Sequence, residues 1–163
     1  MVWHEEINEI KKRDTLSKKQ GGEESVKKHH EKGRLTIRER IDCLLDSKTF
    51  DELGVGAGVP VFDDNNELID FQPANFVLGF GEVAGRKVII GGEDFTLKGG
   101  SPNPAGLRKS VYAEQLALQY KAPLVRLHEG GGGAVGGTSQ NKNHRPLGEP
   151  VFNMSRFYSL AQT

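Results

Sequence analysis

Cysteine, tryptophan and long apolar runs are scarce in this sequence, which has a single cysteine, Cys43, and a single tryptophan among its 163 residues. One cysteine cannot form an internal disulfide, so a disulfide framework is excluded and a reducing compartment is favoured. Cys43 lies inside an apolar helical pattern, and we interpret it as a small core residue. No run of about 18 apolar residues occurs, so we expect no membrane span. The N-terminus has no apolar signal core and many acidic residues, which argues against a presequence.

The common catalytic and metal-binding motifs are also missing. The five histidines show no metal-ligand spacing, and His29 and His30 lie in a charged segment where exposed side chains are expected. His128-Glu129 starts like the zinc-protease helix motif, but glycines follow it and no second histidine comes four residues after His128. No Gly-Lys-Ser/Thr triplet and no serine in a nucleophile elbow occur. We therefore expect no metal in this chain and no P-loop or serine-triad chemistry.

The composition is that of a folded globular protein, with 36% hydrophobic and 27% charged residues. The length is that of one ordinary domain or of part of a larger one. Net charge is zero, but residues 96–163 carry 8 basic and only 3 acidic side chains. Such an excess favours an anionic ligand or a solvated basic face. Of the 21 glycines, 14 fall between Gly79 and Gly137, which indicates a segment with tight backbone approaches.

The first third of the chain has the pattern of helices. Residues 4–19 and 23–32 are predicted to form charged, largely exposed helices separated by two glycines. A third helix is predicted in "LTIRERIDCLLD", where Thr36 and Glu39 have the spacing of a capping box. We predict that residues 1–53 form a helical N-terminal segment that packs on something larger.

Residues 54–163 have the pattern of an α/β domain. Residues 54–75 are predicted to be an irregular or strand-edged connection, and residues 75–83 and 86–94 a β-hairpin. A helix is predicted from Asn103-Pro104 to Tyr120, with two apolar stripes that imply cover on both sides. Residues 123–128 are predicted to form a strand parallel to the second hairpin strand, and a further helix is predicted from Pro150.

The glycine run in "RLHEGGGGAVGGT", Arg126–Thr138, follows that strand directly. Two stretches, Gly79–Ala84 and Gly131–Gly136, match the dinucleotide-binding glycine pattern, but a strand follows the first and no helix follows the second. An oxyanion hole is the other functional reading, because glycines let two backbone N–H groups point at one oxygen. The loop "DFTLKGGSPNP" follows the neighbouring strand, so both loops are expected at one edge of the sheet, where they could face a shared cleft. Loops that only permit tight packing remain the alternative.

Four linked motifs together resemble the β (carboxyltransferase) subunit of biotin-dependent acyl-CoA carboxylases of the propionyl-, methylcrotonyl- and acetyl-CoA type. They are "KGRLTIRERIDCLLD", "DFTLKGGS", "RKSVYAEQLALQYKAPLVRL" and "EGGGGAVGG", and the resemblance runs from about Glu5 to Thr163 in the family's order. It implies the N-terminal portion of a crotonase-like (ClpP/crotonase) ββα superhelix, preceded by a helical segment. It also implies transfer of CO2 from carboxybiotin to the α carbon of a short-chain acyl-CoA, through an enolate held by backbone N–H groups.

The resemblance implies partners and a compartment as well. The partners are acyl-CoA, a biotin carboxylase and a biotin carrier subunit that presents carboxybiotin, and other copies of the chain in a hexamer built from dimers. No nucleic acid and no membrane are expected as partners. The compartment is the cytoplasm in a bacterium or the mitochondrial matrix in a eukaryote.

Carried onto this sequence, the family's oxyanion loop matches the glycine run, and we predict that the N–H groups of Gly131 and Gly132 bind the thioester oxygen. The family often has Asp-Ser-Gly-Gly-Ala-Arg there, whereas here Glu129 is followed by four glycines. The family's acyl-CoA loop matches Phe95, Thr96, Gly99, Gly100 and Ser101. Three basic side chains are candidate partners for CoA phosphates or else members of a solvated face: Lys98, Arg108 and Lys109.

Family chains continue through the rest of the first domain and a second domain. We therefore expect an incomplete domain in residues 54–163 and little or no activity of this chain by itself. The alternatives are a non-catalytic assembly or regulatory piece of such a complex and a nucleotide-binding α/β domain.

Overall fold

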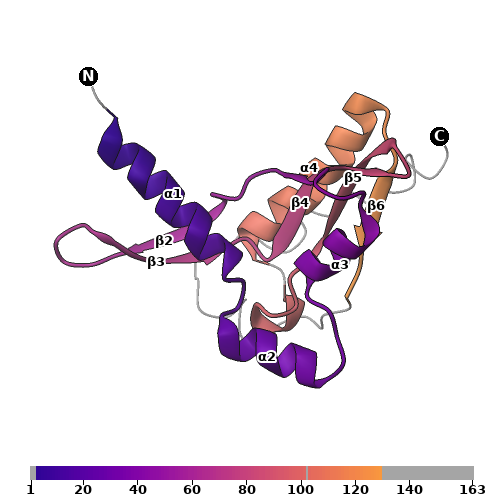
Figure 1. The fold of residues 1–163 in the computed structure, drawn as a ribbon. Coiled ribbons are helices and arrows are strands. Elements are labelled where there is room, and N and C mark those ends of the chain that lie inside the picture. The colour runs from indigo at the N-terminus through magenta and orange to yellow at the C-terminus, as the bar shows by residue number, and fades with distance from the viewer. Residues whose placement is uncertain (1–2, 102, 130–163) are drawn as a thin grey trace, which may run out of the picture. The chain divides into compact units, whose positions relative to one another are not determined.

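The computed structural model of the protein describes residues 3–101 and 103–129. Three helices come first in this part of the chain (Figure 1): α1 His4–Lys18, α2 Glu23–Glu31 and α3 Ile37–Leu44. Five strands follow: β1 Asp51–Glu52, β2 Gly58–Phe62, β3 Leu68–Pro73, β4 Phe76–Val83 and β5 Arg86–Glu93. A 3₁₀ turn, η1 Lys98–Gly100, then leads to α4 Pro104–Tyr120 and β6 Leu124–Leu127. The glycine run and the helix predicted from Pro150 lie outside the described residues.

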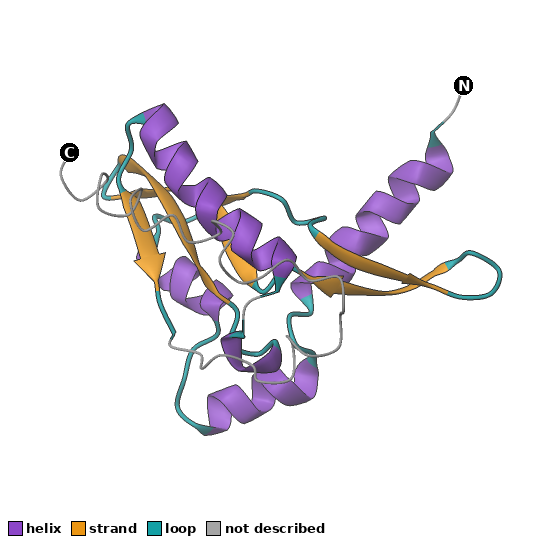
Figure 2. Ribbon diagram, turned by 180° about the vertical axis from the view of Figure 1, so that it is seen from behind, coloured by secondary structure: helices purple, strands orange, loops and turns teal. Residues whose placement is uncertain are grey.

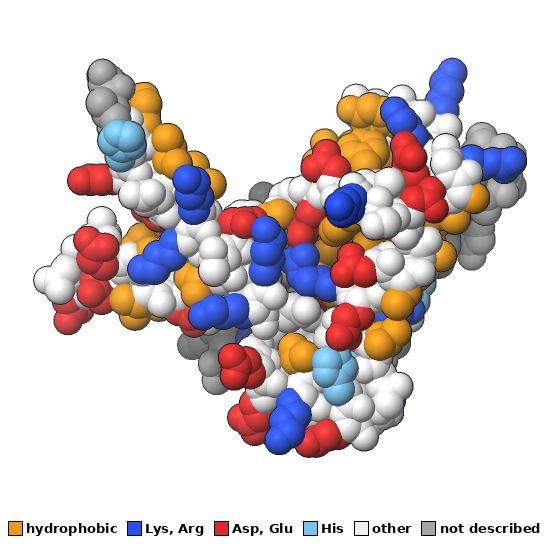
Figure 3. All heavy atoms as spheres, in the orientation of Figure 1, with side chains coloured by type: hydrophobic (Ala, Val, Ile, Leu, Met, Phe, Trp, Pro, Cys, Tyr) orange, Lys and Arg blue, Asp and Glu red, His pale blue; other side chains and the backbone are white. Residues whose placement is uncertain are grey.

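The three N-terminal helices form where they are predicted. Ion pairs one helical turn apart support the charged ones, such as Lys18 with Asp14 at 2.7 Å in α1 and Lys28 with Glu24 at 2.7 Å in α2. The helix α1 also carries three exposed large apolar side chains on one face, and Figure 3 shows apolar side chains along it. These residues are Trp3 at its N-cap, Ile7 and Ile10.

His29 is buried, so the prediction of an exposed side chain on a charged helix is wrong. The side chain is 5% exposed because the chain after α2 folds back over it. Its Nε2 lies 3.2 Å from the carbonyl oxygen of Leu35, and its ring lies 6.0 Å from the ring of Phe95.

The capping box at the start of α3 is confirmed. The Thr36 hydroxyl accepts from the N–H of Glu39, and the Glu39 carboxylate accepts from the N–H of Thr36. Ile37 and Ile41 are then buried. Cys43, two residues beyond Ile41 and therefore on the far side of the helix, is exposed, so its prediction as a core residue is wrong.

The strands β4 and β5 form the predicted hairpin. Ala84 and Gly85 join them with φ values of 51° and 74°, the left-handed pair that a two-residue turn needs. Asp46 stabilises this turn from outside, because its carboxylate accepts from the N–H groups of Ala84 and Gly85 at 3.1 and 2.7 Å. The strand β5 follows the glycine pattern at Gly79–Ala84. A dinucleotide-binding turn needs a helix at that place, so the pattern is not such a turn.

The segment 54–75 is more regular than predicted. It contains a second antiparallel hairpin, β2–β3, whose tip is held by Asp63 accepting from the N–H of Glu67 at 2.8 Å. Two of its large apolar side chains, Val59 and Ile69, are 60% and 55% exposed. The strand-edged form of the predicted connection is therefore confirmed, whereas the pairing of its strands into a hairpin was not predicted, because these exposed apolar side chains obscure the in–out alternation of a half-buried strand.

The main sheet has the strand order β1-β4-β5-β6 and a helix on each face, α3 on one and α4 on the other (Figures 1 and 2). Successive side chains of β4 and β5 alternate between the two faces, as strand geometry requires. One cluster packs against α3: Ile37, Ile41, Leu45, Val77, Val88 and Ile90. The other packs against α4: Phe76, Leu78, Ile89, Ala113, Leu116 and Ala117.

The helix α4 begins as predicted, with the Asn103 side chain accepting from the N–H of Gly106 at 2.7 Å and proline at the first position. Its buried residues form a single face of mostly small side chains: Gly106, Lys109, Ala113, Leu116 and Ala117. Tyr112, Leu118 and Tyr120 are about half exposed, at 46%, 54% and 57%. The prediction of a helix covered on both sides is therefore wrong.

The strand β6 pairs with β5 in parallel, in the register Gly92↔Leu127, which confirms the predicted parallel unit. Across the described part of the chain, no helix has the length and apolar character needed to span a bilayer.

Candidate functional site

The loop Asp94–Ser101 leaves β5 at the edge where β6 also ends. Asp94 is 3% exposed, and its Oδ1 accepts from the N–H and the hydroxyl of Thr96 at 3.0 and 2.5 Å. Burial raises the pKa of Asp94, and the hydrogen bonds from Thr96 oppose that rise. The Thr96 hydroxyl in turn accepts from the N–H of Gly21 at 2.9 Å. The start of this loop is thus fixed to the connection between α1 and α2.

The end of the loop contains the two glycines predicted for the acyl-CoA site. Gly99 and Gly100 have φ values of 62° and 72°, a region that other residues adopt only with strain. Gly99 is exposed, whereas a Cβ on Gly100 would lie 3.0 Å from the Phe95 ring. Lys98 precedes them, exposed, and Ser101 follows, half-buried.

Two asparagines hold the loop end against the start of α4. Asn75 donates to the carbonyl oxygen of Ser101 at 2.6 Å and accepts from the N–H of Asn103 at 3.1 Å. Asn103 donates to the carbonyl oxygen of Pro73 at 3.1 Å while capping the helix. These contacts couple the 94–101 loop to the N-terminus of α4.

The edge of the sheet brings the two predicted loops together. Glu129, the residue before the glycine run, has its carbonyl oxygen 3.8 Å from the place where a Cβ on Gly100 would be. The expectation that both loops leave one sheet edge is confirmed up to Glu129. Gly131 and Gly132 lie outside the described residues, so their predicted role stays a prediction.

Glu129 is held by three side chains from the helical N-terminal segment. Its carboxylate lies 3.4 Å from the Arg34 guanidinium, 3.8 Å from that of Arg40 and 3.6 Å from Nε2 of His29. Sequence reasoning missed this cluster, because Arg34 and Glu129 are 95 residues apart and the spacing along the chain gives no signal.

The two basic residues predicted on α4 face different surroundings. Arg108 is exposed. Lys109 is 8% exposed and donates to the carbonyl oxygen of Gly54 at 3.3 Å, so a solvated position is wrong for it. Burial lowers the pKa of Lys109 to about 8, while the nearby Glu52 carboxylate opposes this and the Arg38 guanidinium adds to it.

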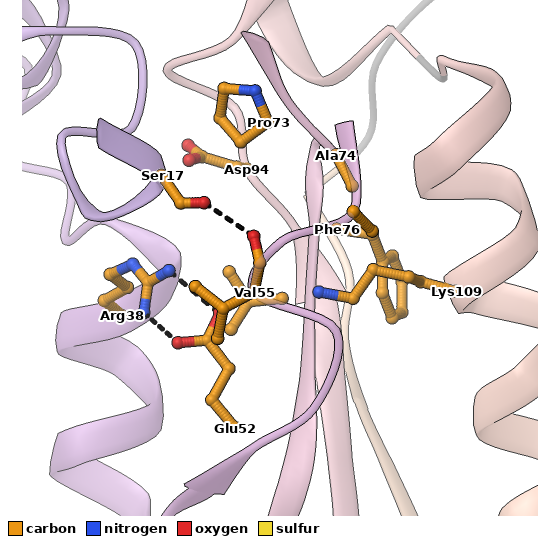
Figure 4. Close-up of a pocket in the computed structure, with 11 residues that line it drawn as sticks. Ser17, Arg38, Glu52, Val55, Pro73, Ala74, Phe76, Asp94 and Lys109 are labelled. Carbon is orange, nitrogen blue, oxygen red and sulfur yellow. Dashed lines mark hydrogen bonds and ion pairs between the residues drawn. The ribbon is translucent and has the colours of Figure 1, made fainter. Parts of the chain in front are cut away.

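Lys109 lines a small cavity of about 10 Å³ (Figure 4), enough for about one water molecule. Arg38 and Glu52 form a two-pronged ion pair on its wall, with N–O distances of 2.6 and 2.9 Å. Ser17 donates to the carbonyl oxygen of Val55 at 2.7 Å beside them. Among residues 3–101 and 103–129, no group of three or more potential metal ligands converges.

Comparison with known proteins gives consistent matches. A family described as "Carboxyl transferase domain" matches residues 28–159. A propionyl-CoA carboxylase beta chain of Cereibacter sphaeroides is 32% identical over 131 residues, 79% of this chain and 25% of that protein. A probable biotin-dependent acyl-coenzyme A carboxylase beta2 subunit of Mycobacterium tuberculosis is 38% identical over 113 residues, 69% of this chain and 20% of that protein.

A solved structure, the transcarboxylase 12S hexamer with methylmalonyl-coenzyme A and methylmalonic acid bound, matches with a TM-score of 0.68 and 27% identity. The match covers 83% of this chain and 26% of that one. This chain therefore spans about a quarter of the length of the relatives that it matches.

Proposed function

The chain belongs to the carboxyl transferase domain family, and from that premise we propose that it provides the acyl-CoA side of a biotin-dependent carboxyltransferase. The predicted family is thereby confirmed, together with the α/β, crotonase-like fold and its helical N-terminal segment. The proposed reaction moves a carboxyl group from carboxybiotin to the α carbon of a short-chain acyl-CoA.

The observation that carries this proposal is the meeting of two loops at one sheet edge. The 94–101 loop follows β5, Glu129 follows β6, and the Glu129 carbonyl oxygen lies 3.8 Å from the position that a Cβ on Gly100 would have. Loops at the carboxyl ends of parallel strands are the usual place for ligands in α/β proteins. The glycine run that begins after Glu129 would add backbone N–H donors at the same edge.

In the proposed reaction, the N–H groups of Gly131 and Gly132 donate to the thioester oxygen of acyl-CoA. This oxygen gains negative charge as the enolate forms, and each such donor is typically worth about 3–4 kcal/mol in the transition state. Carboxybiotin, when bound, supplies the CO2 and a nitrogen that accepts the α-proton.

The exposed basic residues beside the loop are the candidates for the phosphates of CoA. Lys98 lies in the loop itself, and Arg108 lies in the first half of α4. Both are exposed, so their charges are free to meet a diphosphate in solvent. Lys109 is buried and points to the cavity instead, and we leave it out of the phosphate site.

The partners in this proposal are a biotin carboxylase, a biotin carrier subunit and further copies of the chain. The matched transcarboxylase 12S is described as a hexamer, which supports assembly with like chains.

Calorimetric titration with propionyl-CoA tests the proposal. We expect saturable binding that Gly132→Val abolishes, because a side chain there would occupy the space of the thioester oxygen. Given carboxybiotin and propionyl-CoA, we expect little or no turnover by these 163 residues alone, since they span about a quarter of the matched relatives. Binding that survives Gly132→Val would argue against the glycine run, and measurable turnover would refute the expected inactivity.

A further inference from the structure

Glu129 is a carboxylate held out of water at the point where the chain leaves the sheet. Its side chain is 17% exposed, and a carboxylate at that depth is costly unless it is paired. Two guanidinium groups and an imidazole converge on it, all from the segment between α2 and α3 or from these helices. We call Glu129, His29, Arg34 and Arg40 the Glu129 cluster.

The neighbours of the His29 ring determine which of its nitrogens carries a hydrogen on that side. Nε2 faces two acceptors, the carbonyl oxygen of Leu35 at 3.2 Å and the carboxylate of Glu129 at 3.6 Å. Because neither can donate, Nε2 carries the hydrogen. His29 is 5% exposed and cannot turn away into solvent, so it holds Glu129 from the buried side.

The same side chains also hold the other loop of the proposed site. The Arg34 guanidinium lies 5.7 Å from the centroid of the Phe95 ring, and the His29 ring lies 6.0 Å from it. Phe95 in turn lies 3.0 Å from the position of a Cβ on Gly100. Two side chains of the N-terminal segment therefore contact both Glu129 and the 94–101 loop.

From these contacts we propose that Glu129 is a positioning residue of the acyl-CoA site, held by His29, Arg34 and Arg40 so that the segment after β6 is fixed at Glu129 beside the 94–101 loop. This inference rests on the proposed function. It makes α2 and α3 part of the site, because His29, Arg34 and Arg40 hold Glu129, and the first two of these also contact Phe95 of the 94–101 loop. Small losses of such positioning are expensive, since a displacement of about 1 Å can cost about a hundredfold in rate.

The test compares Glu129→Gln with Glu129→Asp and with a matched control, Glu114→Gln. Glu114 is as buried as Glu129, with 16% of its side chain exposed, and from α4 it pairs at 3.5 Å with Arg126 of β6, a residue outside the Glu129 cluster. Amide hydrogen exchange is followed over residues 94–101 and 128–133, which leave out Arg126, without ligand, and propionyl-CoA binding is measured by calorimetry.

For Glu129→Gln we expect faster exchange in both segments and a dissociation constant for propionyl-CoA raised by about tenfold or more. Glu129→Asp should recover part of both effects, because it keeps the charge. Glu114→Gln should change neither the exchange in these segments nor the dissociation constant, even where it lowers the midpoint of thermal unfolding. Exchange in Glu129→Gln that is no faster than in Glu114→Gln would overturn the proposal.

Two further results keep the outcome clear. If Glu129→Gln does not fold, Arg34→Gln removes one partner at a half-exposed position and should give a smaller change of the same sign. No change in exchange for Arg34→Gln would then count against the proposal. Faster exchange in the variants, together with no binding of propionyl-CoA by the unaltered chain, would uphold Glu129 as the residue that holds the two loops together and would overturn the proposed function.

Discussion

Lys109 is the residue at which burial and charge are most directly opposed. Its side chain lines a cavity with room for about one water molecule. Its one hydrogen bond among the described residues is donated to the carbonyl oxygen of Gly54, at 3.3 Å. Burial lowers the pKa of Lys109 from 10.5 to about 8, a change that corresponds to about 3 kcal/mol. The folded state therefore disfavours the charged form of this side chain.

This opposition predicts how stability depends on pH. Below pH 8 Lys109 is charged in both the folded and the unfolded state, so the folded state bears the full free-energy cost of burying the charge. Between pH 8 and 10.5 the side chain loses its proton in the folded state but keeps it in the unfolded state. We expect the free energy of unfolding of the native chain to rise relative to Lys109→Met across that window, by at most about 3 kcal/mol. Urea unfolding of both proteins at pH 7, 8, 9 and 10 measures this. A difference that does not change with pH would contradict the buried position of Lys109.

The 3₁₀ turn η1 is the element where backbone strain and packing can be separated. Gly99 and Gly100 are neighbours with nearly the same φ, 62° and 72°, but different surroundings. A Cβ on Gly99 would have nothing closer than 4.0 Å, whereas one on Gly100 would lie 3.0 Å from Phe95.

Alanine at these two positions gives a matched pair. We expect Gly99→Ala to cost about 1 kcal/mol for the left-handed backbone alone, and Gly100→Ala to cost more because Phe95 must also move. Denaturant unfolding measures both costs. Propionyl-CoA binding should weaken more in Gly100→Ala, because Phe95 packs against the Glu129 cluster. Equal losses of stability in the two variants would show that Phe95 moves freely.

At the scale of elements, the sequence was sufficient where local signals were strong. The capping box of Thr36 and Glu39, the Ala84-Gly85 turn and the Asn103-Pro104 start of α4 each fixed a boundary correctly. The covered face of α4 was predicted wrongly, because the residues that meet the sheet are small. Ala113 and Ala117 bury little area each, and so the larger but exposed side chains misled the pattern.

The site was predictable only in part for a related reason. The loop after β5 and the strand before the glycine run could be identified from motifs and strand order. The Glu129 cluster and the Arg38–Glu52 pair join residues that only the fold brings together, and no spacing along the chain marks them. Periodicity reports which face of an element is apolar, but it does not report which charged side chains meet across elements.

For the whole molecule, the N-terminal helices and the sheet act as one support for the proposed site. Gly21 binds Thr96, His29 and Arg34 contact Phe95, and the same two side chains hold Glu129. The predicted boundary after residue 53 marks a change in sequence pattern. Contacts from residues before that boundary nevertheless hold the 94–101 loop and Glu129.

The central claim is that propionyl-CoA binds between the 94–101 loop and the glycine run, and selective ¹⁵N labelling of glycine tests it most directly. On titration with propionyl-CoA, the account predicts shifts of the amide signals of Gly99, Gly100, Gly131 and Gly132. The signals of Gly81 and Gly85, which lie at or near the turn of the β4–β5 hairpin and therefore at the opposite end of β5 from this edge, should stay in place. No shift at saturation, or shifts confined to Gly81 and Gly85, would contradict the account.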